Sequence, residues 1–226
     1  NNDMANIFTS SIGKKLIMSI SGLFLILFLF IHAFVNALSL ISDEAFQAGC
    51  EFMSLPIVTV MVPVLAAGFI IHIVYAFILN AMNLKARGPQ RYAVANKAKT
   101  DDWASKNMLV LGIIVLGALA FHLTHFWAKM QLPEMMGQHA EQGPVLMYQT
   151  FKPLWVVIVY LVWFVALWLH INHGFWSALH TLGLNNSIWM KRWKVVSLVV
   201  STVLVVVFIA VALKAYFVAN GFCGCC

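Results

Sequence analysis

Long apolar runs separated by short polar segments make up the pattern of this sequence. A transmembrane helix needs roughly 20 apolar residues, and five runs meet that requirement. They cover residues 16–40, 55–84, 106–129, 153–182 and 195–219. The first run is longer than the core of a signal peptide, so we expect it to remain as a span. The pattern predicts an all-α integral membrane bundle of five transmembrane helices, with residues 1–226 forming one domain.

The composition agrees with a lipid environment. The chain is 62% hydrophobic and only 10% charged, whereas an ordinary soluble domain is about 25% charged because its surface faces water. The polar segments are too short for a soluble catalytic domain, so any polar chemistry would belong to a partner. The net charge of +6 does not indicate nucleic-acid binding, because the basic residues lie beside the spans, where orientation signals occur.

The basic residues also predict the orientation. Placing the N-terminus in the cytoplasm leaves only Lys129, Lys152 and Lys214 outside, as the positive-inside rule requires. The other basic residues then lie in the cytoplasm: Lys14, Lys15, Lys85, Arg87, Arg91, Lys97, Lys99, Lys106, Lys191, Arg192 and Lys194.

Histidine is the ionisable residue that enters the spans. Of the eight histidines, only His139 lies in a loop. An ionisable side chain in the hydrocarbon region is costly, so it suggests a functional site. Asp, Glu, Lys and Arg are confined to loops and span ends, which argues against an ion pump or charge-relay transporter, because these need carboxylates near the midplane.

Four of the histidines, one on each of the first four spans, fall at two depths. With the rise of an α-helix, His32 and His122 lie about 16 and 10 Å below the outer ends of their spans. His72 and His170 lie about 31 and 27 Å below theirs. The sequence predicts an outer pair, His32 and His122, and an inner pair, His72 and His170, roughly 15 Å apart along the membrane normal.

Two such pairs are typical of two stacked haems. Neutral imidazole is a good axial ligand of haem iron, and two imidazoles leave no open position, which favours electron transfer over oxygen binding. Spacing alone leaves His125 as an alternative to His122, and His173 as an alternative to His170, because each lies nearly one turn away. The other interpretation is that these histidines only form hydrogen bonds between helices.

Small residues one turn from the ligands predict a recess for a flat macrocycle. Gly68 lies four residues before His72, and Gly174 lies four residues after His170. Positions four apart share one helix face, so both glycines are expected on the ligand side.

Short segments around these histidines resemble the single-subunit dihaem cytochrome b that anchors succinate dehydrogenase and fumarate reductase in the membrane. The segments are SISGLFL at 19–25 leading to His32, FIIH at 69–72, FHL at 121–123 and LHINHG at 169–174. Their order and their placement on successive spans are specific, and the resemblance covers nearly the whole chain. One departure is Trp168, where some dihaem relatives have a glutamate thought to help protons cross the membrane.

The resemblance implies a set of ligands, cofactors and partners. His32 and His122 would bind the distal haem b, and His72 and His170 the proximal haem b. An iron-sulfur subunit and a flavoprotein subunit would lie on the cytoplasmic side of a bacterial inner membrane. Electrons would pass between the iron-sulfur subunit, the two haems and a quinone, expected to be menaquinone. The chain would then be the quinone-reactive subunit of a succinate:quinone oxidoreductase.

Three further residues are candidates within that interpretation. Quinone reduction takes up two protons, so a proton-exchanging group is needed at the membrane edge. Glu51 is the only acidic residue at the predicted outer mouth of the second span, although a helix-start carboxylate favoured by the macrodipole explains it equally well. Ser19 and His180, at the inner ends of their spans, are candidates for holding the proximal haem propionates, and ordinary polarity at helix ends is the alternative.

Two other functions fit the same pattern. A dihaem cytochrome b of another quinone-linked oxidoreductase, such as a formate dehydrogenase or hydrogenase, would have similar histidines. A haem-free membrane transporter or assembly protein would use them structurally.

Overall fold

The computed structural model describes residues 10–87 and 103–222, and within these ranges the chain is helical with no strand. Five helices are long and apolar enough to cross a membrane. They are α1 (Ser11–Leu38), α4 (Met61–Arg87), α6 (Met108–His125), α9 (Leu154–Thr181) and α10 (Ser187–Ala219). The predicted all-α bundle of five membrane-spanning helices is therefore confirmed. Three basic residues assigned to the cytoplasm lie outside the described residues: Arg91, Lys97 and Lys99.

The helix ends differ from the predicted spans where local hydrogen bonding, rather than hydropathy, decides the boundary. α10 begins at Ser187, well before residue 195, because the Asn186 side chain accepts a hydrogen bond from the Trp189 N–H at 2.8 Å. α6 ends at His125 rather than at residue 129. The second span is interrupted at Val60, which separates the short helix α3 (Pro56–Thr59) from α4.

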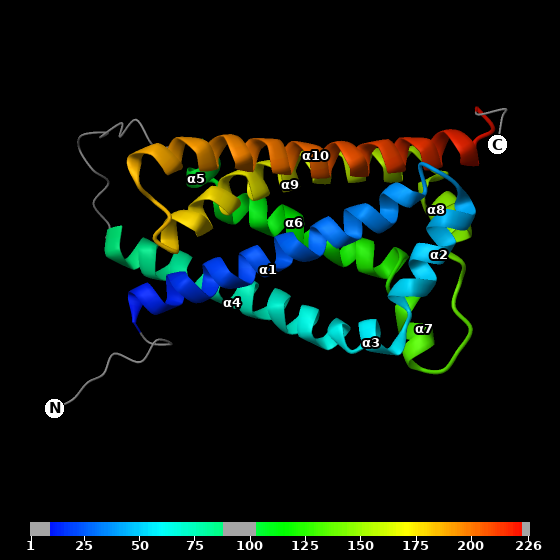
Figure 1. Cartoon of the computed structure of the whole chain (residues 1–226), viewed down its shortest axis with the longest axis horizontal. Helices are drawn as coiled ribbons and strands as arrows, with labels where there is room; N and C mark the ends of the chain where they lie inside the picture. Colours follow the sequence, from blue (N-terminus) through cyan, green and yellow to red (C-terminus); the bar gives the residue numbers. More distant parts are fainter. Residues whose placement is uncertain (1–9, 88–102, 223–226) are drawn as a thin grey trace.

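Short helices occupy the segments that were predicted as loops. α2 (Asp43–Met53) follows α1, while α7 (Gln131–Met135) and α8 (Gly143–Phe151) follow α6; α5 (Trp103–Lys106) precedes α6. α2 begins where Ser42 Oγ accepts a hydrogen bond from the Ala45 N–H at 3.1 Å. Figure 1 shows α2, α7 and α8 gathered at one end of the bundle. In the predicted orientation this is the outer end, and it is called so below.

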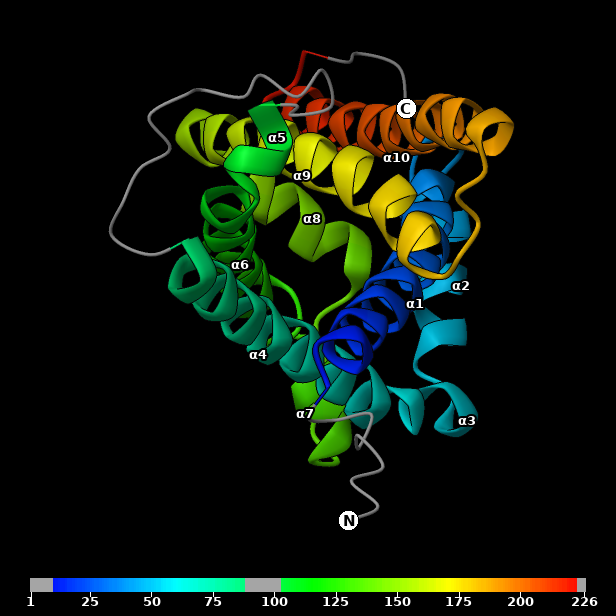
Figure 2. The same cartoon turned by 90° about the vertical axis from the view of Figure 1, so that its left-hand side faces the viewer.

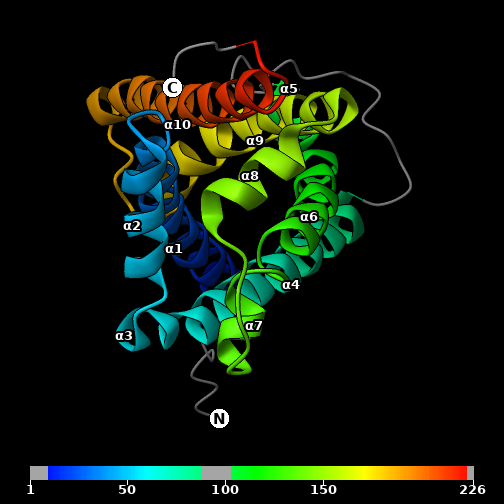
Figure 3. The ribbon, with the colours of Figure 1, turned by 90° about the vertical axis from the view of Figure 1, so that its right-hand side faces the viewer.

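Four of the long helices form a ring. α1 packs against α4 and α9, and α6 packs against the same two helices. Consequently α1 faces α6, and α4 faces α9, across the ring, as the two end views show (Figures 2 and 3). α10 lies outside the ring along α9. It also contacts α1, where the Lys214 ammonium donates a hydrogen bond to the Ser39 carbonyl.

The buried core is unevenly distributed around this ring. The main cluster of buried apolar side chains comes from α1, α2, α8, α9 and α10. In the most apolar stretch of α4 and of α6 only 6% of residues are buried, compared with 44% in α9 and 39% in α10. Lipid is as apolar as these side chains, so their exposure to it costs little. α4 and α6 therefore contribute little to the buried core.

Candidate haem-binding histidine pairs

The four predicted ligand histidines meet as two pairs inside the ring. The imidazole rings of His32 on α1 and His122 on α6 have centroids 5.8 Å apart. The rings of His72 on α4 and His170 on α9 have centroids 6.3 Å apart. Each pair joins two helices that face each other across the ring, and all four side chains are half-buried. A group bound between the two imidazoles of a pair would therefore contact helices on opposite sides of the bundle.

Two glycines locate the inner pair relative to the outer pair. A Cβ atom on Gly22 of α1 would lie 3.2 Å from the His72 ring, and one on Gly112 of α6 would lie 3.6 Å from the His170 ring. On each of these helices the outer-pair histidine follows ten residues later. Ten residues of α-helix rise about 15 Å, which equals the separation predicted from the sequence.

The neighbouring histidines have other contacts. The Nδ1 atom of His125 lies 2.8 Å from the Phe121 carbonyl oxygen, and its ring packs against the Phe121 ring at 4.3 Å. The His173 ring packs edge-on against Trp176 at 4.8 Å. Spacing left the choice within each cluster open. In the structure His122, and not His125, faces His32, and His170, and not His173, faces His72.

A hydroxyl group lies beside one ring of each pair. Tyr160 OH is 3.3 Å from His122 Nδ1, and Ser21 Oγ is 3.3 Å from His72 Nδ1. Ser21 donates its own hydrogen to the Met18 carbonyl at 3.0 Å, so its oxygen is an acceptor toward His72. The Nδ1 atom of His72 then carries the proton, which leaves the Nε2 lone pair available to a metal.

The donor set and its spacing fit haem iron. A metal–imidazole bond is about 2 Å long and the ring centroid lies about 1 Å further out, so two imidazoles on opposite sides of one iron have centroids about 6 Å apart. The observed 5.8 and 6.3 Å agree with that value. Among the described residues no group of three or more His, Cys, Asp or Glu side chains could hold a metal ion. A metal held by either pair thus needs additional donors, which the nitrogens of a porphyrin would provide.

The recess predicted at Gly68 and Gly174 is not where the ligand rings lie. A Cβ atom on Gly68 would lie 2.7 Å from the Phe24 ring, and one on Gly174 would lie 3.4 Å from Met108 Cε. These two glycines permit close approach of neighbouring helices. The space beside these glycines is thus occupied by Phe24 of α1 and by Met108 of α6. The glycines beside the inner pair come from the other two helices.

The structure also places the two candidates for propionate contacts. Ser19 is buried on α1, one turn before the glycine that contacts His72. His180 is exposed in the last turn of α9, about 15 Å along the helix from His170. Ser19 therefore lies near the inner pair, whereas His180 lies at the inner end of the bundle.

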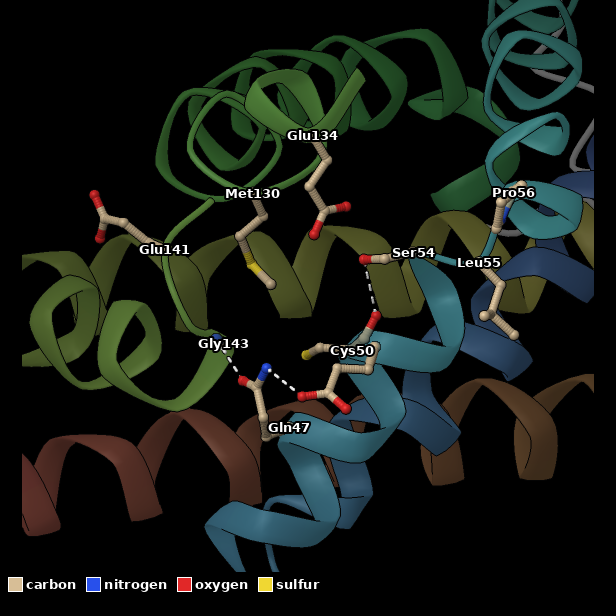
Figure 4. A pocket seen from close by; sticks show the side chains of 10 residues that line it. Gln47, Cys50, Ser54, Leu55, Pro56, Met130, Glu134, Glu141 and Gly143 are labelled. Atoms are coloured by element: carbon tan, nitrogen blue, oxygen red, sulfur yellow. Dashed lines mark hydrogen bonds between the residues drawn. The ribbon is translucent and has the colours of Figure 1, made fainter. Parts of the chain in front are cut away.

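Glu51 lies on α2, not at the start of the second span, because the chain forms a separate helix before that span begins. Its side chain is exposed, and one carboxylate oxygen accepts a hydrogen bond from Gln47 Nε2 at 3.1 Å. Together with residues following α6, it lines a pocket of about 190 Å³ at the outer end. The pocket is partly open, and the side chains that line it are drawn in Figure 4.

Two further carboxylates line this pocket, so Glu51 is not the only acid there. Glu134 on α7 points toward Ser54, whereas Glu141 points away from the pocket (Figure 4). Cys50 on α2 also lines the pocket. Burial raises the pKa of its thiol to about 11, and the negative charges of Glu134 and Glu51 contribute secondarily. The pocket therefore combines partly buried polar groups with at least two carboxylates.

Contacts between α2 and α8 shape the pocket. The Gln47 side-chain oxygen accepts a hydrogen bond from the Gly143 N–H at 3.1 Å, and Tyr148 OH donates to Asp43 at 2.6 Å. A Cβ atom on Gly143 would lie only 2.6 Å from Cys50 Sγ, so this close approach requires glycine. Such contacts join residues about 100 positions apart and left no local signal in the sequence.

Comparison of the chain with protein-family models, with curated proteins and with solved structures found no match.

Proposed function

We propose that this chain is the dihaem cytochrome b that anchors a succinate:quinone oxidoreductase, a succinate dehydrogenase or fumarate reductase, in a bacterial cytoplasmic membrane. Its partners would be an iron-sulfur subunit and a flavoprotein subunit at the inner end. The observation that supports this best is the two histidine pairs on four membrane-spanning helices. The imidazole centroids are 5.8 Å apart in the outer pair and 6.3 Å apart in the inner pair.

In this proposal the polypeptide positions two one-electron carriers. The haems, when bound, supply reversible one-electron transfer. The four histidines would hold the irons, one pair for each haem, and the hydroxyls of Tyr160 and Ser21 would orient one imidazole of each pair. With a rise of about 15 Å between them along α1 and α6, the two pairs would lie in opposite halves of the bilayer. Electrons can thus cross the apolar region without a charged side chain at that depth.

The outer pocket supplies proton exchange in the same scheme. Oxidation of succinate to fumarate on the flavoprotein releases two electrons and two protons. Reduction of a quinone, expected to be menaquinone, to its quinol consumes two electrons and two protons, and fumarate reduction reverses both reactions. Glu51 is our candidate for exchanging the quinone protons, since it is exposed at the pocket and hydrogen-bonded to Gln47.

The haem proposal is tested by haem content. The purified chain should carry two b haems with low-spin spectra, and His122→Ala and His72→Ala should each remove about half of the haem, because each breaks one pair. His125→Ala is the matched control on α6, and it should retain both haems. A reduced-minus-oxidised spectrum without a b-type band would instead favour a haem-free transporter or assembly protein.

The identity of the complex is tested by the subunits that copurify. Covalent flavin together with iron-sulfur clusters would support a succinate:quinone oxidoreductase. Molybdenum or nickel-iron in the partner would contradict it and favour a formate dehydrogenase or hydrogenase.

The role of Glu51 is tested with its amide. Glu51→Gln should lose most quinone-dependent turnover while haem content stays at the wild-type level, because only the proton-exchanging group is removed. Glu44→Gln, on the same helix but outside the pocket, is the control. Unchanged turnover in Glu51→Gln would exclude this residue as the proton-exchanging group.

A further inference from the structure

A second pocket lies near the inner end of the bundle, between α9 and α10. It has a volume of about 140 Å³ and is lined by Asn172, Trp176, Lys194 and Leu198. The ammonium of Lys194 lies 4.8 Å from the centroid of the Trp176 ring, within the range of a cation–π contact. The contact holds the positive charge at the edge of the pocket. Its N–H groups that do not face the ring can still donate hydrogen bonds.

Lys194 marks the depth of this pocket. The next basic residue on α10 is Lys214, and the segment between them, 195–213, has no charged residue. Twenty residues of helix span about 30 Å, the thickness of the hydrocarbon core. Lys214 lies at the outer end, where it donates to the carbonyl of Ser39 just after α1. Lys194 therefore lies at the opposite boundary, at the level of the lipid headgroups.

The pocket faces away from the haem-binding histidines. Asn172 follows His170 by two residues, which is about 200° around an α-helix. Its carbonyl accepts a hydrogen bond from Ser197 of α10, the helix outside the ring. Leu198 is 44% exposed and its neighbour Val195 is 61% exposed, as expected for side chains that contact lipid tails. The pocket is therefore separate from the inner histidine pair and borders lipid.

The charged residues of α9 and α10, the two helices that form the pocket, are all basic. No Asp or Glu follows Glu141 in the sequence, so α9 and α10 contain no carboxylate that could neutralise Lys194. Lys191 and Arg192 lie within one turn of it. A basic pocket between membrane helices on the cytoplasmic side, bordered by apolar surface, has the chemistry that recognises an anionic lipid.

We propose that this pocket binds one anionic phospholipid. Its phosphate accepts hydrogen bonds from Lys194 at the edge of the pocket, and its acyl chains lie along Leu198 and Val195. A soluble anion is the less suitable occupant, because the pocket borders lipid tails. This proposal does not depend on the haem proposal.

Native mass spectrometry of the full chain, with any subunits that copurify, tests the proposal. The protein in detergent is given equal amounts of phosphatidylglycerol or phosphatidylcholine, and the lipids retained are counted. The wild type should retain one phosphatidylglycerol in preference to phosphatidylcholine. Lys194→Gln should weaken that binding about fivefold, the effect expected from one basic residue near an anionic lipid. Lys85→Gln, at an exposed lysine of α4, which packs against α1 and α6 and not against the pocket helices, is the matched control and should bind as the wild type does.

Several outcomes would overturn the proposal. They are equal retention of the two lipids by the wild type, unchanged binding in Lys194→Gln, and displacement of the lipid by inorganic phosphate, which would indicate a soluble-anion site. Lys194→Arg keeps the charge and should retain the preference, which separates charge loss from misfolding. Trp176→Leu keeps Lys194 but removes the cation–π contact, so its binding should fall between those of the wild type and Lys194→Gln.

Discussion

The outer and inner histidine pairs have similar ring separations but very different surroundings. The outer pair lies among aromatic side chains: Phe28 and Phe208 pack on His32, and Phe126 and Trp163 pack on His122. The main apolar cluster continues from these rings into α9 and α10. The outer pair is thus part of the core of the protein.

The inner pair lies where the protein contributes less packing. Among the described residues, His72 and His170 have no aromatic ring packed on them apart from each other's imidazole, and their close neighbours include glycine on α1 and on α6. His170 Nδ1 is buried without a hydrogen-bond partner, whereas the corresponding atom of His122 lies 3.3 Å from Tyr160 OH. Similar ring separations therefore occur with dense side-chain packing around the outer pair and with glycines beside the inner pair. We therefore expect the inner pair to be the more sensitive to added volume, and the outer pair to lost volume.

The largest expected effect comes from filling the inner space. Gly22→Val should remove about half of the bound haem, because its Cβ alone would lie 3.2 Å from the His72 ring and the added methyl groups would displace that ring. Gly117→Val is the matched control, since a Cβ there meets nothing within 4 Å. Haem content per chain measures both. Two haems in Gly22→Val would show that the inner pair tolerates added volume.

The next largest effect should come from removing packing around the outer pair. Phe208 is 8% exposed, and its ring stacks on Phe164. Phe208→Ala should cost about 3 kcal/mol in the free energy of unfolding, because a cavity opens beside His32. Phe77→Ala on α4, where the ring is exposed, should cost far less. Thermal unfolding in detergent compares the two, and equal losses would mean that the outer pair is not better packed.

Smaller effects should follow from removing the two hydroxyls. An imidazole that donates its Nδ1 hydrogen is a more basic ligand and favours the oxidised metal. Tyr160→Phe should therefore raise the midpoint potential of the outer component alone, by up to about 40 mV for a hydrogen bond of about 1 kcal/mol. Ser21→Ala should raise that of the inner component alone. Redox titration distinguishes the midpoint potentials of the two haems. If either variant shifted both potentials, the assignment of Tyr160 to the outer pair and Ser21 to the inner pair would be contradicted.

The smallest effect concerns the outer pocket. With its pKa raised to about 11, roughly one Cys50 thiol in a thousand is deprotonated at pH 8, so alkylation should be slow. Its rate should rise tenfold for each pH unit up to that value. Glu134→Gln removes a negative charge that raises this pKa and should speed alkylation roughly twofold, whereas Glu141→Gln should not. Peptide mapping after iodoacetamide treatment measures Cys50 separately from the other cysteines.

Periodicity and hydropathy predicted the two histidine pairs, and the limits of these patterns have a physical cause. Depth along a helix follows from residue number alone, so the four histidines could be sorted into two pairs. Gly68 and Gly174 share a helix face with His72 and His170, but the neighbouring side chains that fill the space beside them, Phe24 and Met108, come from other helices and do not follow from the periodicity of one helix. Gly22 and Gly112 do leave a signal, since each precedes an outer-pair histidine by ten residues.

The outer pocket was predicted least well. Glu51 was assigned to the mouth of a span, but α2 is a separate helix that begins at the Ser42 cap. Glu134 was missed as a neighbour because α7 is short, and its place beside α2 depends on contacts between distant segments. Tyr160 was missed for the same reason, since its partner His122 lies on another helix.

Five membrane-spanning helices with histidines at two depths follow from the amino-acid sequence alone, because the cost of polar groups in lipid acts on each helix separately. The packing of the helices against one another shows which histidine of each cluster faces its partner, which hydroxyl lies beside it, and which acids share the outer pocket. These features depend on how each helix is rotated against its neighbours. In a membrane that rotation is decided by side-chain packing and hydrogen bonds between helices, which hydropathy does not encode.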